Sequence, residues 1–272
     1  MLWDTHMHCH FSGDSKADSE SMVLSAISKG LSGICFTDHL DYDYRDEPGL
    51  FLLDLDGYRT EILRLQEKYA SACGEHPAFP VLFGIEIGLQ PQVVADNLAV
   101  TKAYPFDFVI GSSHVVHGID PYYPAYYEGR NEDEAYREYF ESILENLATG
   151  ADYDVYGHID YVVRYGPNRN LFYSYEKYKD IIDEILRTLI QQGKGIEINT
   201  AGLKYGLGHP NPTEDILRRY RELGGEILTI GADAHKPEHI AYDFSKVPAI
   251  LKEAGFQYFT VFKQRKPHFL PL

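Results

Sequence analysis

The chain has 272 residues, of which 44% are hydrophobic and 24% charged, so it is long and apolar enough for one large α/β domain. With 25 basic and 41 acidic residues, its formal net charge of −16 argues against an extended nucleic-acid-binding surface, which needs clustered Lys and Arg. A small anionic substrate remains compatible with this charge, because bound divalent cations invert the local potential.

The sequence also argues against disulfides, secretion and membrane insertion. Cys9, Cys35 and Cys73 are odd in number and form no CxxC pair, so reduced thiols are expected. The opening MLWDTHMHCH carries Asp4 and three histidines where a signal peptide would be apolar, and no apolar run is long enough to span a bilayer. These features predict a cytoplasmic protein with a single domain over residues 1–272, either a monomer or a homodimer.

Short apolar, β-branched or aromatic runs alternate along the chain with longer amphipathic stretches. The predicted strands are Leu2–His6, Gly33–Thr37, Val81–Ile87, Phe108–Ser112, Val155–His158, Gly195–Asn199, Ile227–Gly231 and Tyr258–Phe262. The predicted helices include Leu55–Ala72, Glu132–Leu147, Tyr175–Gln192 and Thr213–Leu223. Such alternation indicates a parallel α/β sheet, either open or closed into a barrel. We expect a barrel, because polar side chains follow nearly every strand at its C-terminal end.

Two pairs of potential metal ligands stand at the ends of predicted strands. His6 and His8 end the first strand, and Asp233 and His235 follow Ile227–Gly231 in the segment GADAH. Residues two apart in a strand point to the same face, so each pair can bind one ion. One pair alone is weak evidence, but two pairs on different strand ends favour a metal site.

Other strand ends carry further potential ligands. These are Asp38 and His39 after GICFT, Glu86 in VLFGIEIG, His114 after DFVIGSS, His158 after DVYG, and Asp14 in the loop after the first strand. Each one alone is more often a hydrogen-bonded core or surface residue. Charged groups are rarely buried without a partner, however. Their convergence on one barrel mouth, with few basic residues nearby, therefore predicts bound cations.

These motifs, in this order from residue 2 to about residue 262, resemble the PHP (polymerase and histidinol phosphatase) superfamily. The strings FSGDS, ICFTDH, AYPFDFVIGSSH, GHIDYVVRYGP and GIEINT look most like its monofunctional histidinol-phosphate phosphatase branch. The resemblance implies a single distorted (β/α)7 TIM-like barrel with three divalent metal ions at the C-terminal ends of its strands. Imidazole and carboxylate ligands suit Zn²⁺, Mn²⁺ or Fe²⁺ better than Mg²⁺ or Ca²⁺.

The resemblance also implies how the ligands are shared among the ions. The first ion takes His6, His8, Glu86 and Asp233; the second takes Asp14, His39 and His235; the third takes His114, His158 and Glu86 as a bridge. Many members have His where Asp14 stands, and Asp is typical of the histidinol phosphatases. Every expected ligand position holds a competent residue, which argues against a non-catalytic copy.

Such a centre is suited to hydrolysis of a small phosphate monoester. A water molecule shared by two ions has its pKa lowered from about 15.7 to roughly 7, and we expect the resulting hydroxide to attack phosphorus in line. The predicted catalytic residues are Glu86, Asp233, His235 and Arg164. Asp233, His235 and an ordered water are all candidates for the general acid. The resemblance implies L-histidinol phosphate as substrate, in histidine biosynthesis.

Several residues outside the ligand set are candidates for binding substrate. Arg164, in YVVRYGP, is the first candidate for a phosphate clamp, because a guanidinium binds two oxygens at once. The alternative is a structural Arg paired with Asp160 or Asp154. The weaker candidates are Asn199, which with Glu197 points inward on GIEIN, and Arg130, Lys204 and His117.

The segment HGIDPYYPAYYEGR, residues 117–130, lies where barrel loops form binding walls. Its tyrosines are Tyr122, Tyr123, Tyr126 and Tyr127. They either stack on an imidazole or shield a cationic amine, or they pack the loop against the rest of the protein.

Three other functions are weighed against histidinol-phosphate hydrolysis. The first is a PHP phosphoesterase acting on nucleotides or other small phosphate esters. The second is an amidohydrolase-like enzyme for C–N bonds, which usually needs a bridging carboxylated Lys or Glu and fits Asp14, His39 and His235 poorly. The third is a binding or regulatory module, against which the complete ligand set argues.

Overall fold

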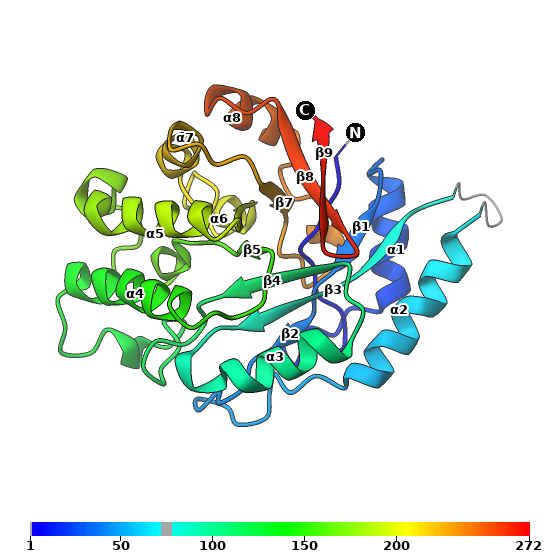
Figure 1. Cartoon of the computed structure of the whole chain (residues 1–272), viewed down its shortest axis with the longest axis horizontal. Coiled ribbons are helices and arrows are strands. Elements are labelled where there is room, and N and C mark those ends of the chain that lie inside the picture. The colour runs from blue at the N-terminus through cyan, green and yellow to red at the C-terminus, as the bar shows by residue number, and fades with distance from the viewer. Residues whose placement is uncertain (1, 72–77) are drawn as a thin grey trace.

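The computed structural model describes residues 2–71 and 78–272, and its central element is a parallel sheet of seven strands. The strands are β1 (Ile34–Phe36), β2 (His39–Leu40), β3 (Val81–Gly88), β4 (Phe108–Ser112), β5 (Val155–Tyr156), β6 (Gly195–Asn199) and β7 (Leu228–Gly231). They follow the order β1-β3-β4-β5-β6-β7 (Figure 1). The short strand β2 pairs with the C-terminal part of β3, whereas β1 pairs with its N-terminal part. The predicted α/β class and parallel sheet are confirmed.

Residues 4–8 join the two edges of this sheet and give it the form of a distorted barrel. On one side, the backbone N–H of Cys35 in β1 donates to the carbonyl of Asp4 at 3.0 Å. On the other side, the backbone N–H of Thr5 donates to the carbonyl of Ile230 in β7 at 2.9 Å. The segment that carries His6 and His8 is therefore held between the first and the last strand of the sheet.

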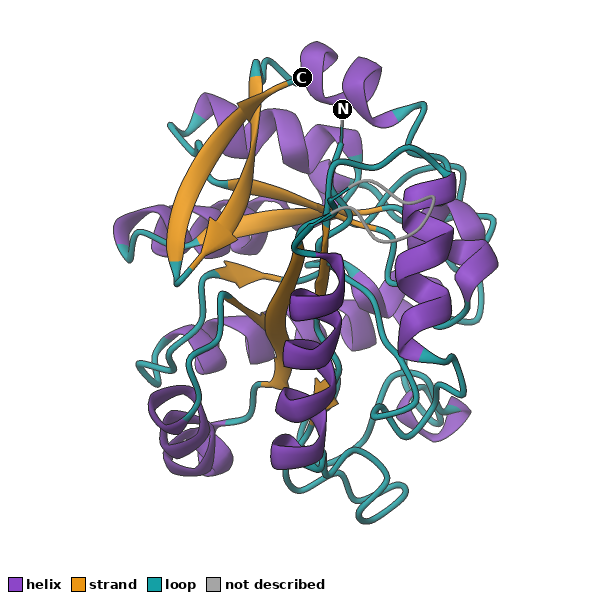
Figure 2. Ribbon diagram, turned by 90° about the vertical axis from the view of Figure 1, so that its right-hand side faces the viewer, coloured by secondary structure: helices purple, strands orange, loops and turns teal. Residues whose placement is uncertain are grey.

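Two predicted strands differ from the structure. Leu2–His6 pairs only through isolated bridges, because its hydrogen bonds are divided between two neighbours. Tyr258–Phe262 forms β8 (Tyr258–Lys263), but it pairs antiparallel with β9 (Lys266–Pro271). The two-residue turn between them has φ values of 51° and 62°, a left-handed turn that reverses the chain directly and leaves no crossover helix. Figure 2 shows this hairpin at one side of the central strands, and β8 packs against β7, where the backbone N–H of Leu228 donates to Thr260 Oγ1 at 3.2 Å.

Helices surround the sheet (Figure 1). The α-helices are α1 (Ser19–Ser28), α2 (Leu55–Tyr69), α3 (Val94–Ala103), α4 (Glu132–Leu147), α5 (Lys179–Gln191), α6 (Ala201–Lys204), α7 (Glu214–Glu222) and α8 (Val247–Glu253). Short 3₁₀ turns are η1 (Pro91–Val93), η2 (Pro124–Tyr126), η3 (Tyr161–Arg164), η4 (Tyr175–Tyr178) and η5 (Pro237–His239). The predicted helices correspond to α2, α4, η4 with α5, and α7.

Helix α4 shows why its segment folds as it does. The Asn131 side chain accepts a hydrogen bond from the backbone N–H of Asp133 and caps the first turn. Tyr139 and Phe140, four and three residues before Ile143, lie with it on one buried face. In the part of the chain that the structure describes, no helix is long and apolar enough to cross a membrane.

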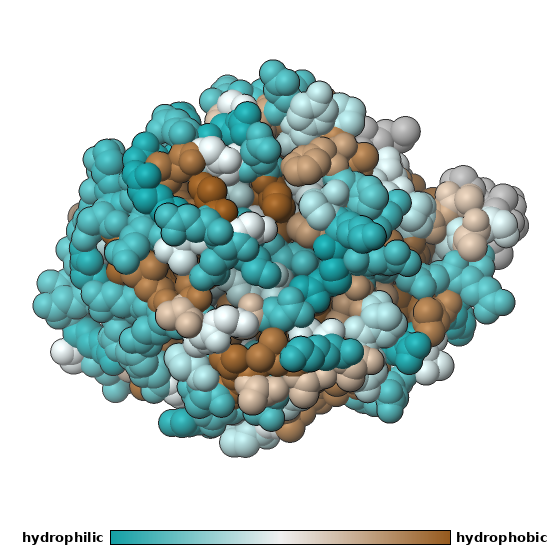
Figure 3. Space-filling view, in the orientation of Figure 1, coloured by the Kyte–Doolittle hydropathy of each residue, from teal (hydrophilic) through white to brown (hydrophobic). Residues whose placement is uncertain are grey.

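The outer surface is mostly polar, as the composition suggests. Figure 3 shows hydrophilic residues over much of the face drawn, with apolar residues in smaller separate patches. Cys9 and Cys35 are buried free thiols, in agreement with the predicted reduced state. Cys73 and the predicted helix end at Ala72 lie outside the described residues.

Strand β7 passes so close to the site that only glycine fits at position 231. A Cβ there would lie 2.2 Å from Glu197 Oε1 and 2.4 Å from the Cβ of His6. We expect Gly231→Ala to lower the free energy of unfolding by about 1–3 kcal/mol, since the buried neighbours have no room to move. Thr229, on the same strand face, is a matched control, because its buried hydroxyl makes no hydrogen bond within the described chain.

Thr229→Val should cost less than about 1 kcal/mol, since it replaces a buried hydroxyl that makes no hydrogen bond in the described ranges with a methyl group of similar size. Urea unfolding of both variants without added metal checks the expectation. Equal losses of stability in the two variants would contradict it.

Candidate metal centre and phosphate-binding cavity

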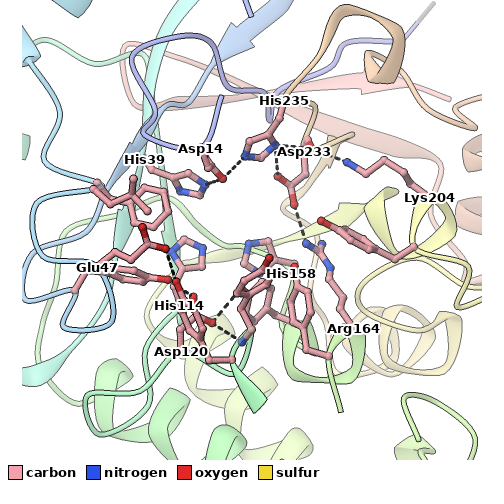
Figure 4. Close-up of a pocket in the computed structure, with 18 of the residues that line it drawn as sticks. Asp14, His39, Glu47, His114, Asp120, His158, Arg164, Lys204, Asp233 and His235 are labelled. Atoms are coloured by element: carbon pink, nitrogen blue, oxygen red, sulfur yellow. Dashed lines mark hydrogen bonds and ion pairs between the residues drawn. The ribbon is translucent and has the colours of Figure 1, made fainter. Parts of the chain in front are cut away.

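The side chains predicted as metal ligands converge at the C-terminal ends of the strands. Figure 4 shows those that line the neighbouring cavity: Asp14, His39, His114, His158, Asp233 and His235. Four overlapping groups each bring three ligand atoms within 4.8 Å of one another. They are His8, His39 and His235; His6, His8 and Glu86; His6, His158 and Asp233; and His39, Glu86 and His114. Asp14 joins them, because its Oδ2 lies 2.9 Å from His235 Nε2. The site therefore contains every residue of the predicted ligand set.

Glu86 stands at the centre of this cluster and is fully buried. Its Oε2 lies 3.1 Å from His6 Nε2 and 3.0 Å from His39 Nδ1. Its Oε1 lies 3.0 Å from His158 Nε2 and 3.2 Å from His114 Nε2. Burial alone would raise the pKa of Glu86, but the surrounding imidazoles outweigh burial and hold that pKa well below its ordinary value. Its two oxygens therefore face different imidazoles, Oε2 toward His6 and His39 and Oε1 toward His114 and His158.

The opposite side of the cluster is more open. Asp14 is partly exposed and lies near both His39, at 3.9 Å, and His235. Asp233 Oδ1 is 3.4 Å from His8 Nε2 and 3.6 Å from His235 Nδ1. These residues leave a face of the cluster accessible from the cavity.

The donor atoms fit divalent cations. His8 Nε2, His39 Nδ1 and His235 Nε2 are buried nitrogens without a well-directed hydrogen bond in the described ranges, although carboxylate oxygens lie 3.4 Å, 3.0 Å and 2.9 Å from them. Leaving buried polar atoms unsatisfied is costly, so such atoms call for a partner. Burial, reinforced by the neighbouring His39 and His235, holds the pKa of His8 well below its ordinary value, so this ring is neutral and has a free lone pair. Imidazoles that face carboxylates form, once deprotonated, a suitable set for Zn²⁺, Mn²⁺ or Fe²⁺.

A second layer of carboxylates orients the imidazoles. Glu197 Oε1 lies 2.6 Å from His6 Nδ1, and its Oε2 accepts the backbone N–H of His158 at 3.1 Å. Asp41 Oδ1 lies 2.9 Å from His114 Nδ1. Contacts of this kind fix the ring orientation of a ligating His. Our sequence reasoning included Glu197 but missed Asp41, whose signal is its place two residues after His39.

Arg164 enters the cavity from η3, just after β5, and is only 3% exposed. Its Nη1 donates to Asp233 Oδ2 at 2.9 Å, and its Nη2 donates to Asn199 Oδ1 at 3.0 Å. The partners Asp160 and Asp154, considered as alternatives from the sequence, are engaged elsewhere: Asp160 accepts from Asn211, and Asp154 from Arg265.

Beside the cluster lies a cavity of about 500 Å³. Six of the predicted ligands line it: Asp14, His39, His114, His158, Asp233 and His235. Its other charged residues are the basic Arg164, Lys204 and Lys236 and the acidic Glu47 and Asp120. Its tyrosines are Tyr44, Tyr122, Tyr123, Tyr161, Tyr165 and Tyr205. A polar cavity of this size suits a small metabolite. Sequence reasoning missed Glu47, Asp120, Tyr44 and Lys236, which lie on loops without a recognisable motif.

The other predicted substrate contacts are placed differently. Lys204 lines the cavity, and its Nζ donates to the carbonyl of Asp233 at 3.0 Å. Asn199 is fully buried beneath Arg164 and does not line the cavity. His117 and Arg130 are outside it, because both pair with Glu138 of α4.

The sharp turn at His117 explains why its side chain lies outside the cavity. Its φ of 50° and that of Gly118, 91°, turn the chain sharply. Within the tyrosine-rich loop, Tyr122 and Tyr123 line the cavity. Tyr126 and Tyr127 are buried and pack the loop instead, through hydrogen bonds to the carbonyls of Ala135 and Val162.

The contact between Glu197 and His6 generates a test of the metal site. Added Zn²⁺ should raise the thermal midpoint of the metal-free protein, since a ligand that binds the folded state stabilises it. Glu197→Gln should lower zinc affinity by about 10- to 100-fold, because His6 loses the carboxylate that orients its ring. Glu184→Gln, at an exposed position of α5, is the control. Chelator competition gives both affinities, and an unchanged value for Glu197→Gln would contradict the orienting role.

Comparison with known proteins agrees with this geometry. A family model described as "PHP domain" matches residues 4–201. The chain is 34% identical over 269 residues to a histidinol-phosphatase of Lactococcus lactis, covering 97% of this chain and 95% of the relative. It is 35% identical over 244 residues to a probable histidinol-phosphatase of Clostridium acetobutylicum, covering 90% of each.

Solved structures show the same fold. The crystal structure of histidinol phosphate phosphatase from Lactococcus lactis, complexed with zinc, L-histidinol and phosphate, aligns with a TM-score of 0.89 at 32% identity and covers 98% of each chain. A putative histidinol phosphatase from Listeria monocytogenes aligns with a TM-score of 0.77 at 20% identity, over 90% of this chain and 99% of that one. Family match, relatives and site geometry agree that this chain belongs to the PHP domain family.

Proposed function

We propose that this protein is a metal-dependent phosphatase that hydrolyses L-histidinol phosphate to L-histidinol and inorganic phosphate, a step of histidine biosynthesis. The observation that carries the proposal is the placement of a buried His and carboxylate cluster beside a buried arginine in one cavity. Support for the substrate comes from the similar Lactococcus lactis enzyme, whose structure holds zinc, L-histidinol and phosphate.

The ligand set is proposed to hold three divalent ions, Zn²⁺, Mn²⁺ or Fe²⁺. His6, His8, Glu86 and Asp233 would hold the first, Asp14, His39 and His235 the second, and Glu86, His114 and His158 the third. When bound, these ions supply an activated water for attack on phosphorus and offset the negative charge of the phosphate. Glu86, Asp233 and His235, together with Arg164, form the proposed catalytic group.

Arg164 has hydrogen-bonding capacity left for the phosphate. A guanidinium has five N–H donors, and three hydrogen bonds of Arg164 go to Asn211, Asp233 and Asn199. These contacts fix the plane of the guanidinium, so the remaining donors on Nη1 and Nη2 meet phosphate oxygens without further ordering. Lys204, also at the cavity wall, adds positive charge on the same side.

The rings of Tyr161 and Tyr205 hold Arg164 from its sides. Each ring centroid lies 5.4 Å from the Arg164 Cζ. Such cation–π contacts stabilise the charged guanidinium away from bulk water. Positive charge thus stays at the phosphate end of the cavity even though the protein as a whole is acidic.

Phosphate release from L-histidinol phosphate by the Zn²⁺- or Mn²⁺-loaded protein tests the proposal. The same assay is run beside nucleotide, sugar and serine phosphates. We expect kcat/KM for histidinol phosphate to exceed the others by about 100-fold or more, because a site built for polar groups rejects ligands that lack them. An even spread over the panel would leave a general phosphoesterase. No release from any ester would reject the phosphatase assignment.

Substitution of Arg164 tests its phosphate role. Arg164→Met keeps length but removes every donor, and we expect kcat/KM to fall by about 10²- to 10³-fold, as for other groups that stabilise transition-state charge. Arg164→Lys keeps the charge but loses the fork, so it should recover only part of the activity. Arg187→Met, at a mostly exposed position of α5, is the control.

Because Arg164 contacts Asp233, the metal content of each variant is measured as well. Wild-type kcat/KM in fully metallated Arg164→Met would refute the clamp.

A further inference from the structure

The cavity beside the metal cluster is electrically divided. Arg164 and Lys204 lie on one side of it, and Glu47 and Asp120 lie on the other, with the metal-ligating imidazoles between them (Figure 4). The basic side suits the phosphate group of a substrate. The acidic side therefore faces the part of the substrate that lies farthest from the phosphate.

Asp120 is the residue on the acidic side that most needs a partner. It is only 4% exposed, and its hydrogen bonds come from neutral donors: the Tyr44 hydroxyl at 2.8 Å, the Tyr122 backbone N–H at 2.7 Å and the Tyr161 hydroxyl at 3.2 Å. In the described ranges 2–71 and 78–272, no Lys, Arg or His forms an ion pair with it.

Some other buried carboxylates of this protein have such partners. Asp154 is 8% exposed and pairs with Arg265 at 2.7 Å. Asp233 is 6% exposed and pairs with Arg164.

Asp4, Asp38 and Asp160, by contrast, are held by neutral donors alone in the described ranges, as Asp120 is. Asp120 differs from those three because it lines the cavity. A buried carboxylate without a cation is costly. A ligand that brings positive charge or N–H donors to Asp120 would offset that cost.

The walls around Asp120 suit a flat ring. Tyr122 contacts Tyr123 edge-on, with ring centroids 5.1 Å apart, and Tyr165 at 5.2 Å. Tyr161 connects the two sides of the cavity, because its ring lies against Arg164 while its hydroxyl reaches Asp120. These rings pack against one another and line the cavity, so they present an aromatic wall on which a planar ring can stack, and such a wall favours a ring that carries positive charge.

Resting on the proposed function, we propose that Asp120, with Glu47 at the outer edge, forms the subsite that selects the imidazole end of the substrate. In L-histidinol phosphate the amine is on the carbon next to the one that carries the ester oxygen, so it stays near the phosphate. The imidazole is farther along and reaches the opposite wall. There its ring N–H donates to Asp120, while Glu47, held by the Tyr123 hydroxyl at 2.7 Å, attracts the positive charge.

The test compares two phosphate esters that differ only in the ring. L-Histidinol phosphate carries imidazole, and L-phenylalaninol phosphate carries the same amine with a phenyl ring. Asp120→Asn should lower kcat/KM for histidinol phosphate by about 30-fold or more, mainly through KM, since a buried charged partner is lost. The phenylalaninol ester should change by less than about threefold. Equal losses for both esters, or no loss for either, would overturn the proposal.

A second variant covers the case in which Asp120→Asn fails to fold. Glu47 is exposed, so Glu47→Gln leaves the core intact. It should raise KM for histidinol phosphate by about two- to fivefold, with less effect at high salt, and leave the phenylalaninol ester unchanged. Glu141→Gln, exposed on α4, is the matched control. Glu47→Gln with no change in the ratio of the two esters would also reject the subsite.

Binding of the product L-histidinol gives a readout that does not depend on turnover. Isothermal titration should show weaker binding to Asp120→Asn than to the wild type, and unchanged binding of inorganic phosphate. Wild-type protein that hydrolyses neither ester would instead reject the proposed function, so the two failures are distinguishable.

Discussion

The constraint on which the rest of the site depends is the burial of a negative charge on Glu86. Its carboxylate is fully enclosed and faces imidazoles on both oxygens. Against the effect of burial, neighbouring carboxylates raise the pKa of His6 and His114, so protonated rings can compensate this charge, whereas burial keeps His8 neutral. Divalent cations can replace those protons, since they pair with the carboxylate and take the imidazole lone pairs at the same time. The parallel sheet serves this arrangement by bringing ligands from distant parts of the chain to one rim.

Much of this was predictable, for identifiable reasons. The strands Phe108–Ser112 and Gly195–Asn199 and the helix Glu132–Leu147 were predicted with the bounds that the structure has. Their apolar periodicity is undisturbed, and turn or capping residues flank them. The ligands converged as expected because parallel strands end at a common rim, so placing each residue at a strand end placed it near the others.

The features that could not be predicted from the sequence are those set by tertiary contacts. His117 follows a rim strand closely in sequence, yet a sharp turn carries it to Glu138 on the surface. Asp120 faces the cavity because its loop is held from outside, by the Asp46 carboxylate that accepts its backbone N–H at 2.9 Å. Neither contact has a local sequence signal. The eighth predicted strand, Tyr258–Phe262, does form a strand, but the turn after it pairs it antiparallel with β9. Sequence patterning alone does not reveal this pairing.

The segment 4–8 has a consequence for how the protein matures. It carries two of the proposed metal ligands, His6 and His8, but is held on one side by β7, more than 220 residues later, and the Asp4 carboxylate accepts the backbone N–H groups of Ala232 and Ala241. During synthesis the first ligands therefore emerge long before the strand that positions them. The proposed centre is complete only when both ends of the chain are in place, so a full set of bound metal ions would report that the sheet has closed.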